Sequence, residues 1–129
     1  MEPESVVEGH QIETYRSLIN IGTFALKFLQ IVNGGAAIAL LAYLGNVTAR
    51  GRRPPDVVVP MILFIAGLVV AGVTTLTVYI TQLTLYNEGL NELPDGRHST
   101  WLNTSIVLAF VSLLCFAVGS VMGALAFRP

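Results

Sequence analysis

The chain has 129 residues, of which 53% are hydrophobic and 12% are charged, and its formal net charge is −1. Soluble domains average about 45 to 50% apolar and about 25% charged residues. This composition argues against a soluble helical protein, because so small a chain could not bury three helices that are apolar on every face.

The charged residues avoid three long windows, at residues 28–49, 57–87 and 98–127. A hydrocarbon core about 30 Å thick needs about 20 apolar residues in a helix, so each window can hold one crossing. We therefore predict an all-α integral membrane protein that forms a single membrane domain over residues 1–129. Its three transmembrane helices are expected at 27–45, 57–81 and 102–127, preceded by an amphipathic N-terminal helical segment.

Residues 1–9 are acidic, contain Pro3 and are expected to form a short flexible tip. They carry no Lys or Arg, so we expect no secretory signal peptide, and the first apolar segment should stay in the mature protein.

Residues 10–26 are predicted to form an amphipathic interfacial helix. A polar stripe recurs there at spacings of three and four and continues into the first span. It consists of Glu13, Arg16, Asn20, Thr23, Lys27, Gln30 and Gly34. We favour a helix that lies flat in the interface, with the crossing beginning near Lys27, whose side chain snorkels to the surface. The alternative is one long tilted helix whose stripe faces partner helices or a pore.

The first span contains Asn33, Gly34 and Gly35, a turn signal within an apolar run. A free turn at this depth is costly in lipid, so we interpret the small residues as a surface for close helix approach. Gly35, Ala39 and Ala42 share this face, and Asn33 can form a hydrogen bond across the contact. The alternative is an unwound segment that binds an ion or a substrate.

Arg50, Arg52 and Arg53 form a basic loop, which we interpret as a topology signal and a lipid anchor, not as a nucleic-acid site. Basic loops face the cytoplasm, which places the N-terminus outside and the C-terminus inside. The second span follows this loop and its helix can continue to Tyr86. One face of it carries small and hydroxyl residues, namely Gly67, Ala71, Thr74, Thr77, Thr81 and Thr84.

Trp101 marks the interface before the third span, whose small-residue face carries Ser105, Ala109 and Ser112 and ends in the GxxxG pair Gly119 and Gly123. Each motif alone is weak, but one such face on every span predicts tight helix packing.

No residues suggest catalysis, cofactor binding or metal binding. The spans hold no carboxylate, Cys115 is the only cysteine, and no nucleophile has a base in sequence reach. His10 and His98 are expected to be solvated loop histidines. We therefore expect a protein that is not an enzyme.

The segment VNGGAAIALLAYLGN, preceded by ETYRSLINIGTFALKF, resembles small uncharacterised bacterial membrane proteins that carry a similar Asn-Gly-Gly-Ala-Ala helix. The resemblance covers about a third of the chain. It implies a three-span protein of the bacterial inner membrane and brings no activity with it. The three-helix layout also resembles class I phage holins, in layout only.

Two functions remain open. The first is a non-catalytic membrane protein that acts through helix association, as a homo-oligomer or an accessory subunit of a larger membrane complex, with membrane lipids as its other partners. The second is a holin-like or effector pore, in which several copies line water with Asn20, Thr23, Lys27 and Gln30 and with the threonine stripe of the second span.

Overall fold

The computed structural model describes the backbone of residues 4–90, 93–94 and 96–127, and the side chains within these ranges from Gly9 onward. The described chain is helical and contains three elements: α1 (Glu4–Ala49), α2 (Val58–Gly89) and α3 (Arg97–Ala126). All three are long and apolar enough to cross a membrane. The expected all-helical chain with three such helices is therefore confirmed.

Local sequence signals fix the ends of the helices. α1 ends at Ala49, two residues before Gly51, whose left-handed backbone (φ 67°) turns the chain without steric cost. The prolines Pro54 and Pro55 then keep the loop extended. α2 begins where the Asp56 carboxylate accepts a hydrogen bond from the Val58 amide at 3.2 Å. α3 follows Gly96, which has φ 91°.

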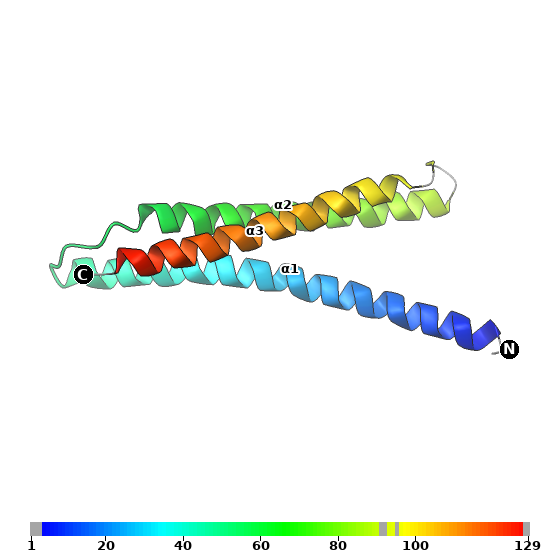
Figure 1. The fold of residues 1–129 in the computed structure, drawn as a ribbon, viewed down its shortest axis with the longest axis horizontal. Coiled ribbons are helices and arrows are strands. Elements are labelled where there is room, and N and C mark those ends of the chain that lie inside the picture. Colours follow the sequence, from blue (N-terminus) through cyan, green and yellow to red (C-terminus); the bar gives the residue numbers. More distant parts are fainter. Residues whose placement is uncertain (1–3, 91–92, 95, 128–129) are drawn as a thin grey trace.

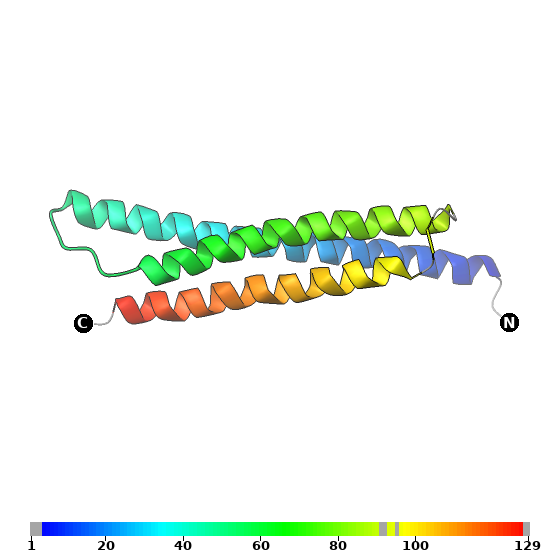
Figure 2. The ribbon, with the colours of Figure 1, turned by 90° about the horizontal axis from the view of Figure 1, so that it is seen from above.

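The helices run up, down and up. α2 and α3 pack against each other along most of their length, while α1 packs on them with its C-terminal half and diverges toward its N-terminus (Figures 1 and 2). α1 has 46 residues, or about 69 Å of helix, against 32 residues in α2. Residues 9–25 of α1 are consequently exposed on every side.

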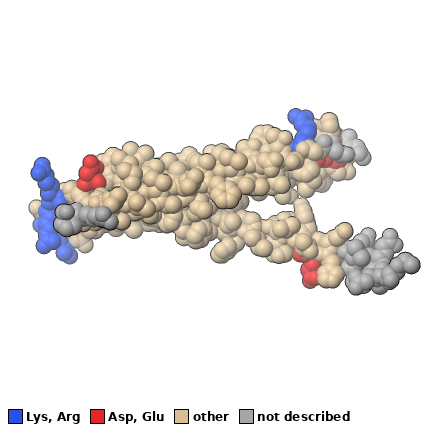
Figure 3. Space-filling model, in the orientation of Figure 1, with Lys and Arg blue, Asp and Glu red and all other residues tan. Residues whose placement is uncertain are grey.

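The interior is narrow, and the outer surface is mostly apolar. Ala37, Leu40, Val57 and Phe64 form the buried apolar cluster, with Phe116 packed against it. Large apolar side chains point outward along all three helices, as in Phe24 (71% exposed), Ile38 (69%) and Leu76 (65%). Figure 3 shows Lys, Arg, Asp and Glu gathered at the two ends of the rod, with the length between them free of charge on that face. This distribution suits a rod surrounded by lipid.

The boundaries differ from the expected ones mainly at the N-terminus. α1 is one uninterrupted helix that runs through Lys27, so the amphipathic interfacial segment at 10–26 is not confirmed as an element of its own. A helix that first lies flat and then crosses must bend, and α1 shows no break. Of the expected flexible tip, residues 1–3 lie outside the described residues and 4–9 belong to α1.

Candidate functional site

The three helices meet at a polar junction formed by Asn33 of α1, Gly67 of α2 and Ser112 of α3. Asn33 and Ser112 are fully buried. The Asn33 amide nitrogen donates to the Ser112 hydroxyl at 3.2 Å and to the Leu29 carbonyl of its own helix at 3.0 Å. The Ser112 hydroxyl in turn donates to the Gly67 carbonyl at 2.8 Å. One chain of hydrogen bonds thus links all three helices.

Gly67 makes this junction possible because it has no side chain. A Cβ atom at position 67 would lie 2.7 Å from Cγ of Asn33 and nearer still to its oxygen. That oxygen, Oδ1, is buried and has no hydrogen-bond partner within the described residues. The residues Asn33 to Gly35 are helical throughout, so the unwound binding segment considered from the sequence does not form.

The hydroxyl stripe of α2 faces α3 and is paired. Thr74, Thr77, Thr81 and Thr84 are buried, and each hydroxyl donates to a carbonyl three or four residues earlier in α2. The Ser105 hydroxyl of α3 also lies 2.9 Å from that of Thr77. Ala71 is fully buried in the same row. This face is therefore a packed seam between two helices.

The GxxxG pair of α3 contacts the start of α2, but its two glycines are not equivalent. A Cβ atom at Gly119 would lie 2.9 Å from the Phe64 ring and 3.3 Å from Leu63 Cβ. At Gly123 the nearest atom would be Pro60 Cβ at 3.8 Å, an ordinary van der Waals distance. Both glycines are buried.

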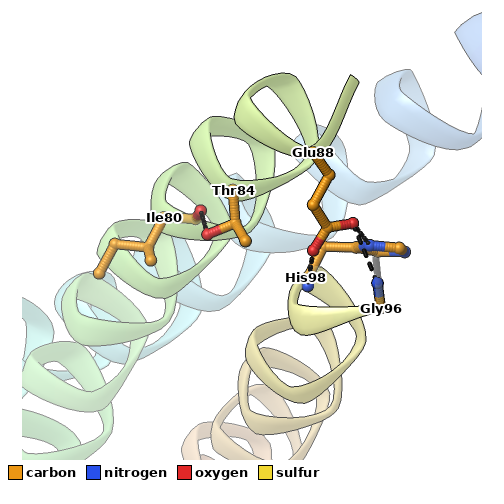
Figure 4. Close-up of polar contacts among 5 residues, drawn as sticks. All are labelled: Ile80, Thr84, Glu88, Gly96 and His98. Carbon is orange, nitrogen blue, oxygen red and sulfur yellow. Dashed lines mark hydrogen bonds and ion pairs between the residues drawn. The ribbon is translucent and has the colours of Figure 1, made fainter. Parts of the chain in front are cut away.

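A carboxylate closes the far end of the α2–α3 seam. Glu88, in the last turn of α2, is 7% exposed and accepts hydrogen bonds from the backbone amides of His98 at 2.9 Å and Gly96 at 3.3 Å. Its other close contact is the His98 ring, with Nδ1 2.6 Å from Oε2 (Figure 4). The N-terminus of a helix carries unpaired amides and a partial positive charge. Glu88 therefore caps α3 from the neighbouring helix.

The pKa of Glu88, which lies beyond the apolar segment 57–81, reflects two opposing effects. Burial by itself raises the pKa by disfavouring the charged form, whereas hydrogen bonds from the His98 ring and from the His98 and Gly96 amides lower it. The hydrogen bonds prevail, so the pKa lies below the ordinary glutamate value. The carboxylate is thus the form that the fold stabilises.

This pair differs from the sequence-based expectation. His98 is not a solvated loop residue, because it lies in the first turn of α3 and its ring is held by Glu88. His10 also lies in a helix, where it is exposed. A signal for Glu88 was present: the α2 stripe at 74, 77, 81 and 84 reaches residue 88 with the next step of four.

The polar stripe of α1 has few partners in the bundle. Asn20, Thr23 and Lys27 are exposed. Gln30 is half-buried, and its amide donates to the Thr75 hydroxyl of α2 at 3.1 Å. Nearer the N-terminus, the Tyr15 hydroxyl lies 3.4 Å from Oε1 of Gln82. The stripe therefore contacts the edge of α2 at one end and is otherwise uncovered.

The remaining predicted residues divide between the bundle and its surface. Gly34 is half-buried against Leu68, where a Cβ atom would lie 3.6 Å from the leucine side chain. Gly35 and Ala39 are exposed, as is Ala42. The basic residues of the loop and the aromatic residue before the third span are also exposed, namely Arg50, Arg52, Arg53 and Trp101.

The described residues contain no group of three or more metal-ligating side chains. Within the described ranges the one close carboxylate–imidazole pair is Glu88 and His98, in which the carboxylate caps α3 and the ring contacts that carboxylate. The buried polar and small residues of the bundle form specific contacts between its helices. Comparison with known proteins found no matching family model, no matching curated protein and no matching solved structure.

Proposed function

We propose that this protein is a non-catalytic membrane protein that works through helix association, either with copies of itself or as an accessory subunit of a larger membrane complex. The observation that carries the proposal is an unused small-residue face on α1, formed by Gly35, Ala39 and Ala42. All three are exposed and lie on the other side of the helix from Asn33. Intramolecular packing therefore does not account for them.

Small residues in line on a membrane helix allow another backbone to approach closely, which strengthens van der Waals packing where lipid provides no hydrophobic driving force. A Cβ atom added at Gly35 would meet nothing within 4 Å. On the inner side of the bundle, the equivalent space at Gly67 is filled by Asn33. The small-residue face of α1 thus resembles the inner contacts in its residues, but no side chain of the bundle fills the space beside Gly35.

The test is cysteine crosslinking in native membranes, with Cys115→Ser as the background and a single Ala39→Cys substitution. We expect a crosslinked product, either a homodimer or one fixed neighbour identified by mass spectrometry. Ala39→Leu should abolish its formation when the reporter cysteine is placed at Ala42. Ala117→Leu, the same change at an exposed site on α3, is the matched control and should leave the product intact.

The proposal fails if the solubilised protein is monomeric and crosslinking recovers no neighbour. It also fails if Ala117→Leu abolishes the product as completely as Ala39→Leu, because the small face would then have no special role.

A pore-forming oligomer is the second candidate, favoured by the exposed polar side chains Asn20, Thr23 and Lys27 on one flank of α1. The threonine stripe of α2 is a weaker candidate for a pore lining than the sequence suggested. It packs against α3, where the Ser105 hydroxyl bonds to that of Thr77, so water could line it only if α2 and α3 separated. Induced expression of a pore former should depolarise cells. Lys27→Leu should weaken this effect, and unchanged depolarisation would remove Lys27 from the pore.

For location, we propose the bacterial inner membrane with the N-terminus outside and the C-terminus in the cytoplasm. The exposed basic loop after α1 supports this orientation. Reporter fusions at residue 129 should be active in the cytoplasm, and activity on the outer side would reverse the orientation.

A further inference from the structure

A shallow groove lies at the C-terminal end of α1, next to the basic loop. It has a volume of about 380 Å³ and is lined by Ala42, Tyr43, Asn46, Val47, Arg50 and Arg52. Arg50 and Arg52 are cationic, Tyr43 and Asn46 carry polar groups, and Ala42 and Val47 are apolar. The groove therefore combines a positively charged end with apolar side chains.

The turn after α1 brings both arginines to this groove. Gly51 adopts a left-handed conformation, and its amide donates to the Thr48 carbonyl at 2.9 Å. The next amide, of Arg52, donates to the Val47 carbonyl at 3.2 Å. This pair of bonds is a Schellman motif, which folds residue 52 back over the last turn of the helix. It also pairs carbonyl oxygens that would otherwise repel an anion.

The arginines carry positive charge that the described chain does not neutralise. Among the described residues, no carboxylate forms an ion pair with Arg50 or Arg52. The nearest acid along the chain, Asp56, accepts a hydrogen bond from the α2 backbone. Figure 3 shows the basic side chains together at this end of the rod. Guanidinium groups match the geometry of phosphate oxygens and bind them in a bidentate manner.

The side chain of Tyr43, which also lines the groove, is held in place by an aromatic contact. The Tyr43 ring packs edge-to-face on the ring of Phe127, the residue that follows α3, with centroids 4.9 Å apart and an angle of 87° between the planes. Tyr43 is 41% exposed, and Asn46 is also exposed. A tyrosine with an apolar body and a polar tip suits the boundary between lipid and water.

We propose that this groove binds the headgroup of an anionic phospholipid, with the phosphate held by Arg50 and Arg52 and the start of an acyl chain lying on Ala42 and Val47. A lipid fits better than a free phosphate ion because the groove continues from the charged loop onto the apolar flank of a helix long enough to cross a membrane. The groove shares Ala42 with the small-residue face, but its charged end, formed by Arg50 and Arg52, lies outside that face, so lipid binding does not depend on helix association.

The test uses the full chain in detergent, with phosphatidylglycerol titrated and bound lipid counted by native mass spectrometry. The double variant Arg50→Gln with Arg52→Gln should bind this lipid at least about tenfold more weakly, because charge-assisted hydrogen bonds are lost. Arg53→Gln is the matched control, since Arg53 is in the same loop but does not line the groove. It should change the affinity by less than about twofold, because an exposed charge outside the site is screened. The melting temperature of each variant checks that folding is intact.

Two further measurements separate the sources of phosphate. Phosphatidylcholine, a zwitterionic lipid, should bind more weakly than phosphatidylglycerol, and inorganic phosphate should not compete with the lipid. Arg53→Gln removes one charge and the double variant removes two. The proposal is overturned if Arg53→Gln costs half or more of the binding free energy that the double variant loses, because the effect would then come from general loop charge. It is also overturned if both lipids bind equally, or if inorganic phosphate competes.

Discussion

The side-chain amide of Asn33 on α1 occupies the space that a Cβ atom would take at Gly67 on α2. The two residues are 34 positions apart in the sequence, yet each limits the size of the side chain that fits at the other position. Asn33 needs a glycine opposite it. The Gly67 carbonyl accepts a hydrogen bond from the Ser112 hydroxyl, which in turn accepts one from the Asn33 amide. The junction should therefore be sensitive to small changes in volume.

Gly67→Ala should destabilise the bundle by about 1–3 kcal/mol, because the Asn33 amide must move and its hydrogen bonds to α3 are strained. Gly72→Ala is the control on the same helix, since a Cβ atom there meets nothing within 4 Å. It should be neutral or gain up to about 1 kcal/mol from helix propensity. Denaturant titration of the purified protein in detergent measures both. Equal stability of the two variants would contradict the role assigned to Asn33.

Ser112→Ala should cost about 1 kcal/mol in the same titration, because it removes the hydroxyl that joins α2 to Asn33. Hydrogen bonds between membrane helices average about 0.6 and reach about 1.7 kcal/mol, and this hydroxyl takes part in two. Ser120→Ala is the matched control. Its exposed hydroxyl bonds only to the Phe116 carbonyl of its own helix, so the change should stay within about 0.5 kcal/mol. A larger loss for Ser120→Ala would mean that helix α3, and not the junction, is being perturbed.

The interior of the bundle could be predicted from residue spacing, since small and polar residues at steps of three and four identify a face. Asn33, Gly67, Ala71 and Thr74 lie inside the bundle. Spacing does not tell which of two faces a helix turns inward, however. For this reason Gly35 and Ala39 belonged to the predicted packing face of α1, whereas the bundle uses the side that carries Asn33.

The Glu88–His98 pair was missed for a different reason. Both residues lie outside the predicted spans at 57–81 and 102–127, where charged and titratable side chains are ordinarily solvated. Their contact depends on how long α2 and α3 continue beyond the apolar segments. α2 extends to Gly89 and α3 starts at Arg97, so Glu88 lies directly against the open end of α3. Helix boundaries, which sequence patterns define poorly, therefore created this contact.

The GxxxG pair provides a test of packing within a single motif. Gly119→Ala should destabilise the protein by about 1–3 kcal/mol, because the new methyl group would lie 2.9 Å from the Phe64 ring, in a tightly packed region. Gly123→Ala, the same change one turn later, faces Pro60 Cβ at 3.8 Å and should be tolerated. Thermal unfolding in detergent compares the two. A greater loss at Gly123 would show that the motif contacts something other than α2.

Glu88→Gln tests the cap on α3 through its pH dependence. The folded-state pKa of Glu88 is below the ordinary value of 4.5, so the folded protein favours the carboxylate. The stabilisation is fully present above about pH 4.5 and is lost as the pH falls through the lowered folded-state value. Wild type should therefore melt at a higher temperature than Glu88→Gln at pH 7, and this difference should shrink in acid. Glu13→Gln, at an exposed residue of α1, should follow the wild-type profile. If the difference between wild type and Glu88→Gln does not change from pH 7 down to pH 3, the ionised carboxylate is not what holds the start of α3.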